Sequence, residues 1–85
     1  MEKYFFTFGS DGRYPYSRDD YVIVEADSLE QALHLFQAAH PNRRGSSCIN
    51  CSSWYFEDEW ELKVSKYYPN TQPKEIIRLT IERRA

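Results

Sequence analysis

Glycine and proline are scarce in this chain, which has three and four of them among its 85 residues. This scarcity excludes long flexible linkers and low-complexity segments built on these residues. Apolar runs are short as well, and none approaches the roughly 20 residues that a membrane-spanning helix needs. A chain of this length has room for one modest hydrophobic core. We therefore expect a single domain, residues 1–85, without a membrane partner.

A strong charge of either sign is also missing. Eleven Lys and Arg against 13 Asp and Glu give a formal net charge of −2. Without a global basic field, we expect no direct binding to nucleic acid. The apolar run at residues 4–8 is too short for a signal peptide, and Asp11 and Arg13 follow it at once. These features predict a cytoplasmic protein.

Recognisable catalytic patterns are absent. The sequence has no Ser/His/Asp set, no glycine-rich phosphate loop and no evident pair of catalytic carboxylates. We therefore expect a protein that is not an enzyme.

Aromatic residues, in contrast, are plentiful, with seven tyrosines, five phenylalanines and two tryptophans. They favour a packed globular domain over disorder. Aromatic and β-branched content predicts strands at residues 4–8, 21–26 and 49–56. The alternation of Ile77, Leu79 and Ile81 predicts a strand near the C-terminus.

Two helices are expected between these strands. Asp27 is a suitable cap for a first helix, Glu30 completes a capping box, and Pro41 ends the helix at His40. The acidic run at residues 57–61 predicts the start of a second helix, in which Trp60, Val64 and Tyr67 would share a face. An alternation of Trp60, Leu62 and Val64 would also fit a strand, but we prefer the helix.

The predicted fold class is therefore α+β. We expect a small two-layer domain with the order β-β-α-β-α-β, its helices on one face of a largely antiparallel or mixed sheet.

The two histidines and two cysteines all fall in one segment, which reads His34-x5-His40-x7-Cys48-x2-Cys51. Thiolates and imidazoles hold zinc in a tetrahedron, and a Cys-x2-Cys turn presents two sulfurs to one ion. The spacing predicts a structural zinc site with His40, Cys48 and Cys51 as ligands and His34 as the weaker fourth ligand, with a carboxylate or another group as the alternative fourth ligand. The alternative is two small buried cysteines and two ordinary histidines. A redox function is less favoured, because a strand and not a helix follows Cys51.

The connection between the first two strands has the composition of a recognition surface. Arg13, Tyr14, Tyr16 and Arg18 belong to residue types that are enriched at binding hot spots. We predict that these four residues contact a partner. The alternative is that Tyr14 and Tyr16 cover the edge of the sheet.

Residues 4–11 (YFFTFGSD), 21–43 and 50–60 resemble small, mostly uncharacterised proteins encoded by phages and mobile elements of Gram-positive bacteria. Small phage proteins of this size include anti-CRISPR inhibitors, which act mainly by binding a nuclease complex. The resemblance implies a protein of the host bacterial cytosol that binds and inhibits a host defence complex, such as a CRISPR effector nuclease. The alternative function is a small zinc-binding protein that is regulatory or associated with nucleic acid.

Overall fold

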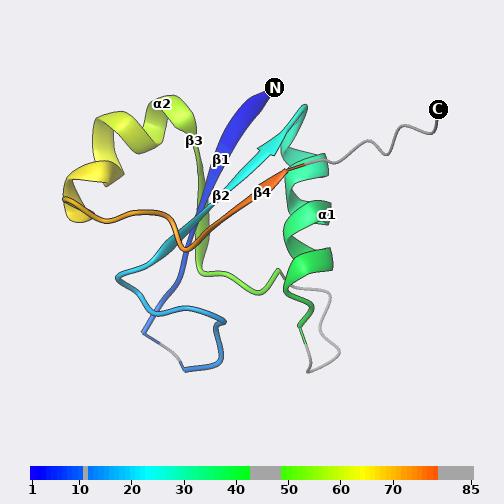
Figure 1. Ribbon diagram of the computed structural model, residues 1–85, viewed down its shortest axis with the longest axis horizontal. Coiled ribbons are helices and arrows are strands. Elements are labelled where there is room, and N and C mark those ends of the chain that lie inside the picture. The colour runs from blue at the N-terminus through cyan, green and yellow to red at the C-terminus, as the bar shows by residue number, and fades with distance from the viewer. Residues whose placement is uncertain (11, 43–48, 79–85) are drawn as a thin grey trace.

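The structure is a computed structural model that describes residues 1–10, 12–42 and 49–78 (Figure 1). Four strands form one sheet, in the spatial order β3-β1-β2-β4. They are β1 (Glu2–Thr7), β2 (Tyr21–Ala26), β3 (Ser53–Phe56) and β4 (Glu75–Arg78). β1 is antiparallel to both β2 and β3, whereas β4 runs parallel to β2. The sheet is thus mixed, and the predicted α+β class is confirmed.

The sequence located the central strands better than the outer ones. β2 has the predicted bounds, and its β-branched run lies against β1 over its whole length. β3 is shorter than predicted, because the chain turns at residues 49–51, where the Cys51 N–H donates to the Ile49 carbonyl (2.8 Å). The predicted C-terminal strand is seen as β4, and its residues beyond Arg78 lie outside the described part of the chain.

Helix α1 (Leu29–Ala39) starts one residue later than the predicted cap implies. Ser28 and not Asp27 is the N-cap, and its Oγ accepts a hydrogen bond from the Gln31 N–H (3.2 Å). Gln31 Oε1 accepts in return from the Asp27 N–H (2.7 Å). A serine and a glutamine three residues apart therefore fix this end. The helix ends at His40, as Pro41 predicts.

α1 covers one face of the sheet. Its Phe36 ring stacks on Phe6 of β1, with 4.5 Å between the ring centroids and 4° between the planes. The buried cluster on this face consists of Tyr4, Phe6, Phe8, Val22, Val24, Ala26, Ala32, Phe36 and Cys51.

A second helical segment covers the opposite face, so the prediction that both helices share one face is wrong (Figure 1). It consists of α2 (Glu57–Glu59), the π-helical turn η1 (Trp60–Val64) and the 3₁₀ turn η2 (Ser65–Tyr67). Trp60 stacks on Phe5 at 4.6 Å. The reason lies in β1, where aromatic residues occupy successive positions and therefore point to both faces. Each face needs its own cover, and the domain has three layers instead of two.

The π-helical turn also changes which tyrosine packs on this face. The Ser65 N–H donates to the Trp60 carbonyl, five residues back, which widens the turn by one residue. Tyr68 therefore returns to the second cluster, with its ring 5.1 Å from Trp60, while the predicted Tyr67 is exposed.

Candidate partner-binding loop

The connection between β1 and β2, residues 8–20, folds back on the core, and we call it the β1–β2 loop. Its first residue, Phe8, is buried in the cluster under α1. Tyr14 and Tyr16 pack on Phe8, with ring centroids 6.3 and 5.5 Å away. Gly9 lies close beneath Tyr14, because a Cβ at this position would lie 3.2 Å from Tyr14 Cε2 and the ring would have to shift slightly. The loop is therefore anchored by its aromatic rings.

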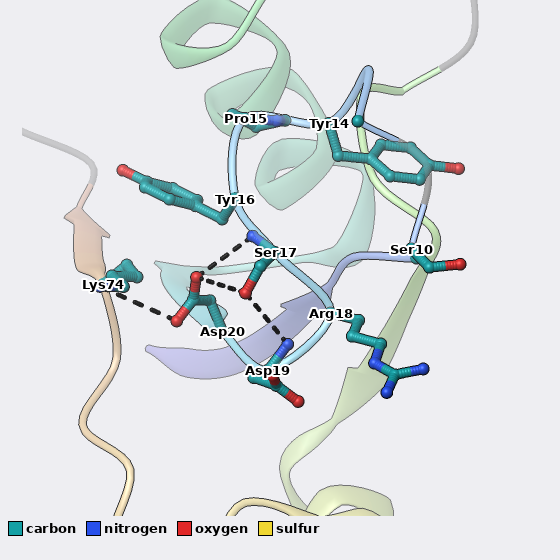
Figure 2. Close-up of a pocket in the computed structure, with 11 residues that line it drawn as sticks. Ser10, Tyr14, Pro15, Tyr16, Ser17, Arg18, Asp19, Asp20 and Lys74 are labelled. Atoms are coloured by element: carbon teal, nitrogen blue, oxygen red, sulfur yellow. Dashed lines mark hydrogen bonds and ion pairs between the residues drawn. The ribbon is translucent and has the colours of Figure 1, made fainter.

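Asp20 organises the far end of the loop. One carboxylate oxygen, Oδ2, accepts hydrogen bonds from the Ser17 N–H (3.1 Å) and the Ser17 hydroxyl (3.0 Å). The other, Oδ1, lies 3.8 Å from Lys74 Nζ, just before β4 (Figure 2). The turn is closed by the Asp20 N–H, which donates to the Ser17 carbonyl (3.0 Å). One side chain thus shapes the turn and joins it to a distant segment.

Two further contacts hold the loop from either side of the sheet. The Tyr16 hydroxyl donates to Glu75 Oε1 of β4 (3.3 Å). Tyr68 is the residue after η2, and its hydroxyl donates to the Arg18 carbonyl (3.3 Å). Burial, and then the negative charge of Glu75, raise the pKa of Tyr16, so this hydroxyl stays protonated as a donor.

An open hollow of about 620 Å³ lies along the loop. Figure 2 shows Ser10, Tyr14 and Arg18 reaching to one side of the loop, with Tyr16 on the other side near Lys74. The lining combines an aromatic ring, an arginine and the carboxylates of Asp19 and Asp20. This mixture of apolar area and both signs of charge suits a protein surface better than a phosphate backbone, which calls for positive charge alone.

The four predicted partner residues have different surroundings. Arg13 and Arg18 are exposed, and only Arg18 of these two lines the hollow. Tyr14 and Tyr16 are half-buried and pack against the core at Phe8. Both also line the hollow, so packing and binding remain compatible for them.

Sequence reasoning missed Asp20, Lys74 and Glu75, which fix the loop. The Ser17-x-x-Asp20 spacing was a usable signal for a turn in which a carboxylate accepts from the backbone. The other two residues carried no such signal, because their contacts join segments far apart in the chain.

His40 belongs to a contact that the predicted zinc site did not foresee. Its Nε2 interacts with Glu75 Oε1, the same atom that accepts from Tyr16. The imidazole also packs edge-on against the Tyr16 ring at 5.5 Å. The Glu75 contact uses one ring nitrogen, so a metal at His40 would bind through Nδ1, with Glu75 as the carboxylate behind the ligand.

The other predicted ligands are dispersed or outside the described residues. His34 is exposed on α1, Cys51 is buried in the cluster under α1, and Cys48 lies outside the described part. Burial raises the pKa of the Cys51 thiol from 9.0 to about 12, which keeps it neutral without a metal. Within residues 1–10, 12–42 and 49–78, no group of three or more His, Cys, Asp or Glu side chains is placed to hold a metal ion. The zinc site stays a prediction, and elemental analysis of the purified protein tests it.

No family model, curated protein or solved structure shows a significant match to this chain. The resemblance to phage and mobile-element proteins therefore stays a prediction. Among the described residues, no helix has both the length and the apolar character needed to cross a bilayer.

Proposed function

We propose that this chain is a non-enzymatic binding module that a mobile element uses to inhibit a host defence complex, such as a CRISPR effector nuclease. The observation that carries the proposal is the β1–β2 loop, in which Tyr16, Arg18 and Asp20 contact β4, the segment before it and the segment after η2. A loop of this length is normally costly to order when a partner binds. Here these long-range contacts favour an ordered loop before a partner binds.

The exposed side chain of Arg18 and the half-buried side chain of Tyr14 supply the contact chemistry. Arg18 offers a guanidinium for carboxylates or carbonyls, and Tyr14 offers a broad ring with a polar tip. The Phe8 ring supports Tyr14, and the Asp20 carboxylate shapes the turn while also lining the hollow. The exposed Arg18 side chain belongs to neither support. Arg18 is therefore the residue whose side chain tests binding with least risk to the fold.

A plasmid-interference assay tests the inhibitory function. Bacterial cells that carry a CRISPR effector nuclease and a plasmid that it targets would express the chain. We expect wild-type protein to restore plasmid retention for at least one effector class, and Arg18→Ala to reduce that protection. Lys63→Ala is the matched control, because Lys63 is an exposed cation on η1, away from the hollow. Equal plasmid loss with and without the chain, for every effector class tested, contradicts the proposal.

A further inference from the structure

β3 is an outer strand of the sheet, and its outer edge has no strand neighbour among the described residues. The chain on either side of β3 leads away from this edge. Before it, the Ser52 N–H donates inward to the Thr7 carbonyl (2.9 Å). After it, the chain crosses the sheet so that Trp60 stacks on Phe5. Within residues 1–10, 12–42 and 49–78, no strand therefore uses the backbone groups on the outer edge of β3.

The two edges of the sheet differ in how they are protected. Charged side chains and proline discourage strand pairing at an exposed edge. The β4 edge has both, since Pro73 and Lys74 precede the strand and Glu75 and Arg78 lie in it. β3 reads Ser-Trp-Tyr-Phe and has neither. Its shortness is the single feature that limits pairing.

Two aromatic side chains of β3 stay uncovered beside α1. Trp54 is 39% exposed and Phe56 is 49% exposed. Both project from the face that α1 covers elsewhere, and their inner sides contact Phe6 (6.4 Å between centroids) and Tyr4 (5.7 Å). An uncharged backbone edge and an exposed aromatic strip thus coincide on one strand.

We propose that β3 pairs antiparallel with β3 of a second copy of this chain. When a two-fold axis perpendicular to the sheet relates the two copies, the α1 face of one copy continues into the α1 face of the other. Residues that oppose each other across the two β3 strands therefore come from the same face of the sheet. A register centred on Tyr55 meets this condition. It places Tyr55 opposite Tyr55 of the second copy, and Trp54 opposite Phe56 of the second copy. The exposed rings then cover each other.

Charge supports a second copy as the occupant. β3 is neutral, so two copies approach without repulsion along the paired strands. In this register the paired strands end at Phe56, because Glu57 already belongs to α2. The acidic segments Glu57–Glu59 of the two copies then lie at opposite ends of the paired strands, and like charges do not face each other.

Sedimentation velocity over a roughly hundredfold concentration range tests the association. Because the register opposes only residues 54–56 of each copy, the interface is small, and we expect a weak dimer whose share rises with concentration. Trp54→Lys should weaken the association about tenfold or more, while Ile76→Lys, at an exposed apolar site on the other edge, should leave it unchanged. A wild-type chain that stays monomeric throughout overturns the proposal, as does a Trp54→Lys dimer of wild-type strength.

The register has its own test, which does not depend on the folding of the lysine variants. Opposed residues in antiparallel strands lie at a distance that a disulfide can bridge. Mild oxidation of Tyr55→Cys should give a disulfide joining position 55 of both copies, identified by peptide mass spectrometry. Ser53→Cys should give no such link, because Ser53 lies beyond the last strand residue of the second copy, and the two Ser53 residues are at opposite ends of the paired strands. A link at position 53 alone, or at neither position, overturns the proposed pairing.

Discussion

At the scale of single residues, Asp20 has the largest influence on the shape of the β1–β2 loop. It accepts two hydrogen bonds from Ser17 and lies within ion-pair distance of Lys74. Replacing it by alanine leaves the Ser17 N–H without this acceptor and unties the turn from the segment before β4. The loop should then lose its fixed geometry while the core stays intact.

We expect Asp20→Ala to lower the free energy of unfolding by about 1–2 kcal/mol. For a domain of this size each kcal/mol corresponds to about 4–8 °C in Tm. Asp19→Ala is the matched control, because Asp19 takes part in the turn through its backbone N–H, which donates to Ser17 Oγ (3.3 Å). Thermal melts followed by circular dichroism provide the measurement, and equal losses for the two variants would argue against this role of Asp20.

Cys51 makes the free energy of unfolding depend on pH in the alkaline range. In the unfolded chain its thiol ionises above pH 9.0, whereas burial keeps it protonated in the folded protein up to a pKa of about 12. The folded state therefore binds the proton more tightly. This contribution is complete below pH 9.0 and is lost as the pH rises through the window between the two values.

Denaturant titrations at several pH values within this window test the prediction. Stability of the wild type should fall more steeply with pH than that of Cys51→Ala. The buried tyrosines, whose pKa values are also raised, add the same pH dependence to the stability of both proteins. Parallel slopes for the two proteins would show that the Cys51 thiol does not titrate as its burial requires.

At the scale of elements, the sequence predicted those helices and strands whose bounds depend on neighbouring residues in the chain. β2 was found from its β-branched run, and α1 from its apolar spacing and from Pro41. The face of the second helical segment could not be found in this way, because it depends on β1 having two buried faces. The π-helical turn also escaped prediction, since a regular 3.6-residue period places Tyr67 where Tyr68 lies.

The second helical segment depends on Trp60, which is buried between Phe5, Tyr21 and Tyr68. Trp60→Ala should cost about 3–5 kcal/mol, because it removes a large ring from a closed cluster. Leu62→Ala is the control within the same turn, as Leu62 is 79% exposed and should change stability little. Urea titrations of the two variants decide the matter. Similar midpoints would mean that this segment does not depend on the Trp60 contact.

At the scale of the whole molecule, long-range contacts connect the loop to the rest of the fold. The Tyr16–Glu75 hydrogen bond joins residues 59 positions apart, and the Tyr68–Arg18 bond joins residues 50 apart. Composition alone indicated that the loop was a candidate binding surface. Its contacts with the rest of the fold could not be predicted, because the groups that make them belong to β4 and to the segment after η2.

Affinity capture tests the central claim, that the chain binds a host complex through this loop, most directly. Tagged wild-type, Arg18→Ala and Lys63→Ala chains would be incubated with host lysate, and the captured proteins quantified by mass spectrometry. We predict that wild type and Lys63→Ala recover the same stoichiometric protein complex, and that Arg18→Ala recovers at least about tenfold less. Equal recovery by all three chains, or recovery of nucleic acid that rising salt removes, would contradict the account.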